Sequence, residues 1–182
     1  EMAIFGAKRM HPRALEPAME HGIPVRVRNT FNPLNLGTMI AGEEKVRSEG
    51  VVKALTLISN VALVTVSGFG MVGTPGTAAK VFSALGSRGV NVMMISQSSS
   101  EANISFIVAR DQLGRAVNAL ETSLLGGDLI RDVATEEDVS IVAAIGAGMK
   151  GTPGVAARLF SAVARRGINV RMIAQGSSEL NI

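Results

Sequence analysis

The sequence has no cysteine, tryptophan or tyrosine among its 182 residues, and only six phenylalanines. Without cysteine there can be no disulfide and no thiolate metal site, and a cytoplasmic location is the better expectation. The formal net charge of +3 is scattered, so the basic stripe and stacking aromatic side chains of nucleic-acid-binding proteins are missing. No apolar run reaches the roughly 18 residues that a membrane-spanning helix needs. We therefore expect no metal, nucleic acid or membrane as a partner.

Hydrophobic residues make up 47% of the chain and charged residues 18%, which excludes a disordered or fibrous protein. The length suits one ordinary domain or two small ones. The first residues, Glu1-Met2-Ala3, lack a basic leader, so we expect the sequence to begin inside a longer protein.

The chain repeats itself. Residues 63–104 match residues 141–182 at an offset of 78, with about 25 of the 42 aligned positions identical. Both copies contain the run Gly-Thr-Pro-Gly, at residues 73–76 and 151–154, and both contain a Gln-x-Ser-Ser-Glu segment. Two copies indicate a tandem or pseudo-symmetric pair, because a solenoid needs more repeats.

The first half of each copy predicts a strand, a glycine loop and a helix. Val61 to Val66 is an apolar, β-branched run typical of a buried strand. Thr74 and Pro75, like Thr152 and Pro153 in the second copy, have the pattern of a helix cap and a first-turn proline. The helices carry one apolar face each, made of Ala78, Val81, Phe82 and Leu85, and of Ala156, Leu159, Phe160 and Val163. Gly89 and Gly167 are expected to end them.

The remaining elements of the first copy complete a known arrangement. Val90 to Ile95 and Asn103 to Val108 are predicted strands, and the second alternates between apolar and polar faces. A helix carrying Leu113 and Leu120 follows, and Ile130 to Val133 would close the unit. The order β-α-β-β-α-β is that of a ferredoxin-like α+β sandwich. The second copy stops at Ile182, within its third strand, so we expect it to be incomplete.

Both glycine loops fit G-x-G-x-x-G, at residues 68–73 and 146–151, each between a strand and a helix. A nucleotide-dependent enzyme is therefore one hypothesis. It lacks the acidic residue that would hold a ribose, since no Asp or Glu occurs between Gly73 and Ser100, and the next strands are predicted to form a hairpin. Free N–H groups at a helix start can instead bind a carboxylate. The third possibility is that the glycines only permit a tight turn.

Gln97 and Gln175 favour a ligand, because they end strands expected near these loops. A glutamine offers a donor and an acceptor, which suits the ammonium or hydroxyl of a small molecule. Backbone N–H groups beside an amide describe an amino-acid pocket. For the serines of these segments, turn capping is as good an explanation as binding.

These segments, Ile95-Ser96-Gln97-Ser98-Ser99-Ser100-Glu101 and Ile173-Ala174-Gln175-Gly176-Ser177-Ser178-Glu179, resemble the tandem ACT domains of aspartate kinases. Residues 5–12 (Phe-Gly-Ala-Lys-Arg-Met-His-Pro) and 25–33 (Val-Arg-Val-Arg-Asn-Thr-Phe-Asn-Pro) are similar to the last part of that family's amino-acid-kinase α/β domain. The resemblance thus covers nearly the whole chain. It implies a kinase tail at 1–47, a first ACT domain at 48–133 and a truncated second ACT domain at 134–182.

The resemblance implies a regulatory region of an enzyme that transfers a phosphoryl group from ATP, with Mg²⁺, to aspartate. This chain would hold neither cofactor and no catalytic residue, although Lys8 matches a family lysine near the nucleotide. The ACT modules would form a homodimer and bind an amino-acid effector. The glutamine-containing segments resemble the threonine-sensitive branch, with lysine as the alternative. The implied effector-binding residues are Gly73, Thr74, Pro75, Gly76, Ile95, Gln97, Ser99, Gly151, Thr152, Pro153, Gly154, Ile173, Gln175 and Ser177.

Two other functions stay open at this stage. One is the enzyme acting at the glycine loops, which lacks an acid–base pair because His11 and His21 lie far from both repeats in sequence. The other is a structural dimerisation module with empty pockets, in which exposed sheet edges pair with a second chain.

Overall fold

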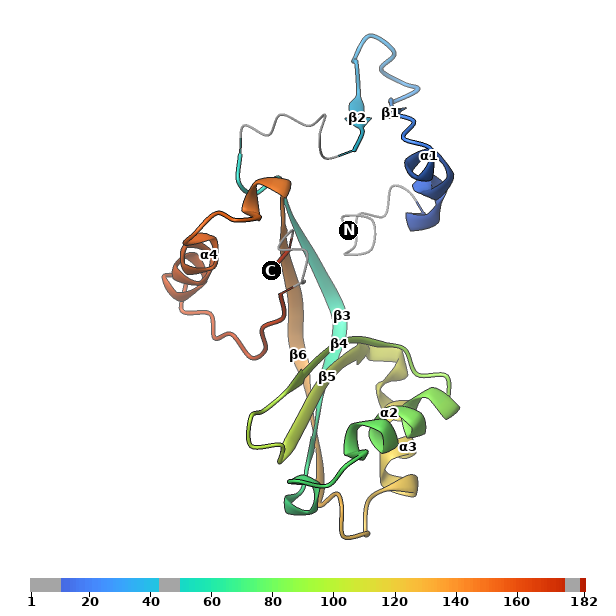
Figure 1. The fold of residues 1–182 in the computed structure, drawn as a ribbon, viewed down its shortest axis with the longest axis vertical. Helices are drawn as coiled ribbons and strands as arrows, with labels where there is room; N and C mark the ends of the chain where they lie inside the picture. The colour runs from blue at the N-terminus through green and yellow to red at the C-terminus, as the bar shows by residue number, and fades with distance from the viewer. Residues whose placement is uncertain (1–10, 43–49, 176–180) are drawn as a thin grey trace. The chain divides into compact units, whose positions relative to one another are not determined.

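The computed structural model describes residues 11–42, 50–175 and 181–182. Two compact units make up the chain. The first module consists of residues 58–141, and residues 169–174 pack with it. Of the residues described, the second unit contains 11–42, 50–57, 142–168, 175 and 181–182. Each unit is described separately below, with the elements labelled as in Figure 1.

The first module is built on a four-stranded sheet with the strand order β4-β5-β3-β6. The strands are β3 (Ala54–Ser67), β4 (Val92–Gln97), β5 (Asn103–Ala109) and β6 (Asp132–Ile145), and β3 and β6 are each divided between the two units. β5 pairs antiparallel with both β3 and β4. In chain order the module is therefore β-α-β-β-α-β, as predicted, with its fourth strand paired to its first.

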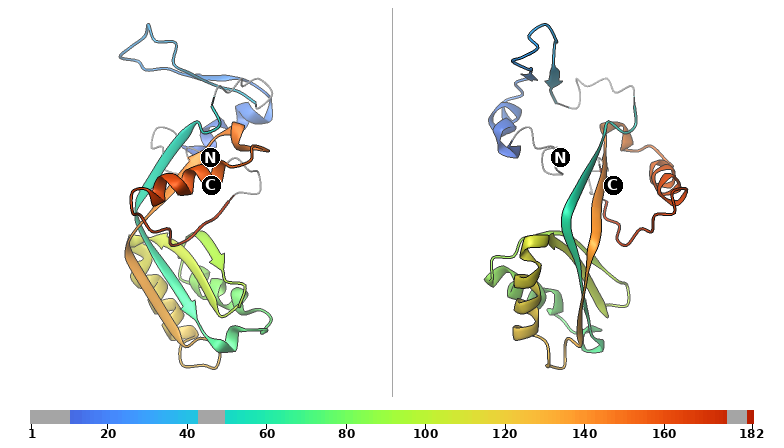
Figure 2. Two further views of the ribbon diagram at one scale, coloured as in Figure 1. Left: turned by 90° about the vertical axis from the view of Figure 1, so that its left-hand side faces the viewer. Right: turned by 180° about the vertical axis from the view of Figure 1, so that it is seen from behind.

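Two helices cover one face of this sheet, as the views in Figures 1 and 2 show. They are α2 (Thr77–Ser87) and α3 (Leu113–Ser123), preceded by the short 3₁₀ turns η3 (Phe69–Met71) and η4 (Arg110–Gln112). The predicted apolar stripe of α2 packs into the core, and Gly89, with φ +65°, follows the helix end as expected. The strands were placed less accurately: β4 begins two residues later than predicted, and β6 extends well beyond Val133.

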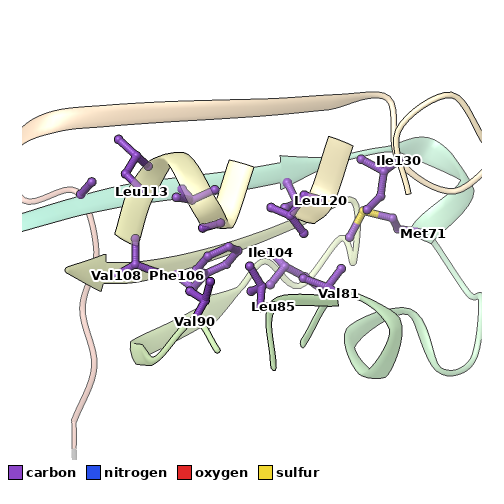
Figure 3. Close-up of a cluster of buried hydrophobic side chains, with 14 residues drawn as sticks. Met71, Val81, Leu85, Val90, Ile104, Phe106, Val108, Leu113, Leu120 and Ile130 are labelled. Carbon is purple, nitrogen blue, oxygen red and sulfur yellow. The ribbon is translucent and has the colours of Figure 1, made fainter. Parts of the chain in front are cut away.

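The core lies between the sheet and the helices. Alternate residues of β3 and β5 point into it, because directly opposed residues of antiparallel strands share a face. Phe106 is fully buried at its centre, and its ring meets that of Phe82 edge-to-face at 6.0 Å. Figure 3 shows Phe106 surrounded by Leu85, Val90 and Ile104. Burial of these apolar side chains is the main force that holds the module together.

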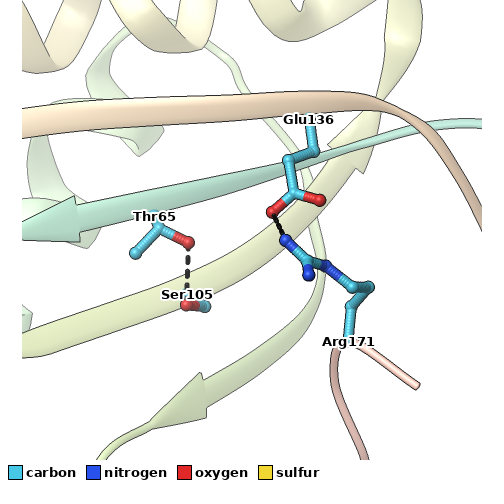
Figure 4. Close-up of polar contacts among 4 residues, drawn as sticks. All are labelled: Thr65, Ser105, Glu136 and Arg171. Carbon is cyan, nitrogen blue, oxygen red and sulfur yellow. Dashed lines mark hydrogen bonds and ion pairs between the residues drawn. The ribbon is translucent and has the colours of Figure 1, made fainter. Parts of the chain in front are cut away.

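The opposite face of the sheet is partly apolar and partly polar. Val61, Leu63 and Ile107 form a buried cluster there, and Met172 packs against it. Nearby, the hydroxyls of Thr65 and Ser105 lie 2.9 Å apart across the strand pair, and the guanidinium of Arg171 donates to the carboxylate of Glu136 (Figure 4). That hydrogen bond and the attraction of the charges raise the pKa of Arg171.

The second unit repeats part of the first module at the same offset of 78 residues. The end of β6 leads into the turn η5 (Ala147–Met149) and then into α4 (Val155–Ala164). Asn181 bridges Ile145 in antiparallel fashion, which matches the pairing of Asn103 with Ser67 in the first module. Of the third strand of the second copy, the structure thus describes one bridge, between Asn181 and Ile145.

The fourth-strand position of the second copy is occupied by residues that precede the first module. The amide of Lys53 donates to the carbonyl of Ile145 at 2.8 Å, and in the first module Arg131 donates to Ser67 at the same distance. Both partners differ by 78 residues between these pairs. Residues 50–53 thus take the place that residues 128–131 hold in the first module. Among the residues described, no helix corresponds to α3 in this copy, and the expectation that the copy is incomplete stays a prediction.

One strand that the repeat implies for the second copy is not formed. Residues 170–175 correspond to β4 at the offset of 78, yet residues 168–175 contain no strand. Within residues 169–174 the side chains of Arg171 and Met172 instead pack against the first module. Tertiary contact has overridden a sequence pattern that is typical of a strand.

The N-terminal part contains a short turn, a short helix and a hairpin: η1 (Pro12–Leu15), α1 (Glu16–Glu20), β1 (Val25–Val27) and β2 (Thr38–Ile40). β1 and β2 form an antiparallel two-stranded sheet of their own. Phe31, between them, is 97% exposed. The prediction that this stretch is the tail of a kinase domain stays a prediction, as do the proposed domain limits at 47 and 133. Among the helices described, none is long and apolar enough to cross a membrane.

Replacing Phe106 with alanine should lower the free energy of unfolding by about 3–5 kcal/mol, because a fully buried aromatic ring leaves a cavity. Phe69→Ala is the matched control. That ring is 81% exposed, so the loss should stay within about 0.5 kcal/mol. Urea unfolding followed by circular dichroism measures both, and equal losses for the two variants would contradict the described core.

Candidate functional site

The two glycine loops have the same backbone conformation. Gly68 and Gly146 are extended, with φ 179° in both, and the later glycines of each loop turn left-handed. Gly73 and Gly151 have φ +64° and +66°, and Gly76 and Gly154 have φ +81° and +84°. These four positions favour glycine because side chains strain a left-handed backbone. The repeated sequence has therefore produced the same loop twice.

The first two glycines of each loop serve a different purpose, which is close packing against a returning strand. A Cβ atom on Gly68 would lie 2.2 Å from the carbonyl oxygen of Leu129, and one on Gly70 would lie 1.9 Å from that of Asp128. In the second unit a Cβ on Gly146 would lie 2.3 Å from the oxygen of Val51. At these positions the glycines therefore allow the loop to pack closely against a strand.

The helices start later than the sequence predicts. Thr74 and Pro75 precede α2, whose first residue is Thr77 and whose cap position is Gly76. The Thr74 hydroxyl donates to the Gly70 carbonyl at 2.7 Å, so it stabilises the loop and does not cap the helix. The second copy repeats this correction: Thr152 donates to Gly148 at 2.7 Å, and α4 starts at Val155, after Pro153 and Gly154. The left-handed glycine prevents the helix from extending back to the proline.

The Gln-x-Ser-Ser-Glu segment meets the glycine loop in the first module. The carboxylate of Glu101 accepts a hydrogen bond of 2.9 Å from the amide of Gly73. Its neighbour Ala102 accepts one of 3.0 Å from the amide of Gly68. The predicted closeness of these two segments is therefore confirmed here, and the loop does bind a carboxylate, which is the protein's own. Glu101 was not among the predicted site residues, although its recurrence as Glu179 in the second copy was a usable signal.

Ile95 and Gln97 lie on β4, at one end of the sheet order. They stand opposite Phe106 and Ile104, so they are on the face that the helices cover. At this edge both remain accessible: Ile95 is 50% exposed and Gln97 is exposed. Ser99 is exposed in the turn that follows. An apolar side chain and an amide are thus both accessible on the same face of this edge strand.

The second copy is less fully defined. Gln175 is exposed and belongs to the second unit, whereas Ile173, 54% exposed, packs with the first module. Ser177 and Lys8 lie outside the described residues. The second set of predicted effector residues therefore remains a prediction from the repeat.

A pocket lies elsewhere in the first module. It has a volume of about 400 Å³ and is lined by residues 68–70 and 126–131, at the close approach of loop and strand. None of the predicted site residues lines it. Asp128 and Arg131 bring both signs of charge to its wall.

The geometry argues against the nucleotide hypothesis. A dinucleotide fold needs a parallel crossover after its glycine loop, but β4 and β5 form the predicted antiparallel pair. The backbone amide of Gly73, which a phosphate would need, already donates to the carboxylate of Glu101.

The chain is similar in sequence to ACT domains and to aspartate kinases. The profile of the ACT domain family matches residues 64–124 and 142–182. The bifunctional aspartokinase/homoserine dehydrogenase of Daucus carota, a chloroplastic protein, is 44% identical over 191 residues, covering 100% of this chain and 21% of the relative. The chain thus spans about a fifth of the length of such bifunctional relatives.

Solved structures extend the likeness to the fold. The ligand-free regulatory subunit of aspartate kinase from Thermus thermophilus is 34% identical, with a TM-score of 0.63 over 71% of this chain and 85% of that one. Aspartokinase III of E. coli, solved with lysine and aspartate, is 31% identical, with a TM-score of 0.75 over 100% of this chain and 39% of that one.

Gly70→Ala should lower the free energy of unfolding by about 1–3 kcal/mol, because the added methyl group meets the Asp128 carbonyl. Gly86→Ala, within α2 and with nothing near its Cβ position, should be neutral or stabilising by up to about 1 kcal/mol. Thermal unfolding compares the two variants. Equal behaviour would show that the close approach at Gly70 is not required.

Proposed function

Since this chain belongs to the ACT-domain family, as a regulatory region of the aspartate kinase type, we propose that it binds an amino-acid effector and controls a kinase. It supplies no catalytic residue itself. The intact protein would phosphorylate L-aspartate to 4-phospho-L-aspartate with ATP and Mg²⁺, the step that begins the synthesis of lysine, threonine and methionine. The cytoplasmic location of this chain stays a prediction. The carrot relative is named as a chloroplastic protein, which is a different compartment.

One observation carries the proposal: the hydrogen bond between Gly73 and Glu101. It joins the glycine loop to the turn that follows Gln97, so backbone N–H groups and a glutamine amide belong to one end of one module. The exposed Ile95 adds an apolar surface on the same strand. An amide for a polar group and an apolar contact suit a small amino acid, whose carboxylate would use a loop donor other than the Gly73 amide.

Threonine is the effector that these residues suit best. The Gln97 amide can bond to a hydroxyl, and Ile95 can contact a methyl group, and a threonine side chain has both. Lysine is the alternative, because the E. coli relative was solved with lysine. The region would act as a homodimer through its ACT modules.

Regulation requires that the effector bind one arrangement of the modules better than another. A tenfold preference would supply about 1.4 kcal/mol, enough to change the proportion of active kinase substantially. The effector would thus favour the less active state of the intact enzyme.

A dimerisation module without ligand is the second candidate, and the edge position of β4 favours it. Ile95 and Met93, which is 39% exposed, would be covered by pairing with a second chain. This candidate predicts a dimer that takes up no amino acid.

Calorimetric titration with threonine, lysine and methionine tests the proposal directly. We expect saturable threonine binding, weakened about tenfold or more in Gln97→Ala because the amide contact is lost. Asn118→Ala, an exposed amide on α3, is the matched control and should bind as the wild type does. Lysine binding alone would move the assignment to lysine, and no binding in a folded sample would favour the ligand-free candidate.

A further inference from the structure

We propose that Glu101 is the positioning residue of the first module, because its carboxylate holds the Gln97 turn and the glycine loop in a fixed relation. The effect on effector affinity rests on the proposed function. The contact itself does not, because it is a property of the module alone.

The contact joins two unusual backbone positions. Glu101 has φ +57° and is the one residue other than glycine with a positive φ in the part of the chain that the structure describes. A glutamate held in this strained conformation needs compensation from its surroundings. Its carboxylate supplies it by accepting the Gly73 amide at 2.9 Å, a charge-assisted hydrogen bond. Gly73 is itself left-handed, with φ +64°.

A continuous set of backbone bonds connects this contact to Gln97. Ser98, the next residue, donates to the Asn103 carbonyl at 3.3 Å and accepts from the Glu101 amide at 3.0 Å. Ala102 then accepts from Gly68 at 3.0 Å. Two hydrogen bonds therefore join the turn to the loop, one to Gly68 and one to Gly73. The bond to Gly73 is the one that a side chain makes, the carboxylate of Glu101. Losing it leaves only the Gly68 contact at the start of the loop.

The tie also decides which donors a ligand can use. Gly73 was expected to offer its amide to an effector carboxylate, but Glu101 already occupies it. An incoming carboxylate must take a different donor, while Glu101 keeps the Gln97 side of the site in place. Burial does not account for the tie, because both groups are exposed. Glycine and glutamate recur at the same offset as Gly151 and Glu179, the latter outside the described residues.

The test uses the full chain and three substitutions: Glu101→Ala, Glu101→Gln and Glu101→Gly. Hydrogen exchange at the Gly73 amide, followed by NMR, reports on the contact, and calorimetry with threonine reports on the site. We expect Glu101→Ala to speed Gly73 exchange about tenfold and to weaken threonine binding by about the same factor. Glu101→Gln keeps an acceptor oxygen and should recover part of both losses.

Glu101→Gly separates backbone strain from the carboxylate, because it relieves the positive φ and still removes the acceptor. It should show both losses if the carboxylate is responsible. Glu121→Ala, on α3, controls for the change in charge and should alter neither readout.

If the Gly73 amide exchanges at the same rate in Glu101→Ala as in the wild type, the Glu101 carboxylate does not protect that amide and the proposal is wrong. Faster exchange with unchanged threonine affinity would overturn the positioning role. A wild-type chain that takes up no amino acid would instead defeat the proposed function, and Gly73 exchange would still decide whether Glu101 anchors the loop.

Discussion

The whole arrangement depends on the absence of two side chains at the start of each glycine loop. Gly68 and Gly70 lie so close to the backbone of Leu129 and Asp128 that no Cβ atom fits between them. This approach brings the end of β3 to the strand that closes the module, and it allows Arg131 to pair with Ser67. The left-handed turn at Gly73 follows this contact in the same loop. Gly68 and Gly70 are thus needed because they lack a side chain, and not because their backbone is flexible.

The same contact explains how a duplicated sequence forms two unequal units. In the second unit Gly146 and Gly148 approach residues 50–52, the counterparts of 128–130 at the offset of 78. Each loop therefore receives a closing strand of the same kind. In one case the strand comes later in the chain, and in the other it comes before the first module begins. The contacts between loop and closing strand are therefore equivalent in the two units, but the order of these segments along the chain is different.

Local sequence patterns predicted the first module well because its elements follow one another along the chain. The alternation in β5, the apolar stripe of α2 and the order of elements could all be read from neighbouring residues. Where a contact outside the periodic pattern decides the outcome, the same patterns failed. The Thr74 hydroxyl bonds to Gly70, in the preceding turn, and not to a helix amide. Residues 170–175 form no strand, although they correspond to β4 in the repeat. The tie from Glu101 depends on a side chain crossing from one segment to another, which periodicity cannot reveal.

The closing strand of the second unit has a consequence for the order of assembly. Lys53 is synthesised before the first module, yet its partner Ile145 emerges only after that module is complete. The first module can form from continuous chain, with pairings of modest separation, whereas the second unit must wait and then close a much larger loop. During translation the early strand stays without this partner while an entire domain folds between the two halves of its eventual sheet.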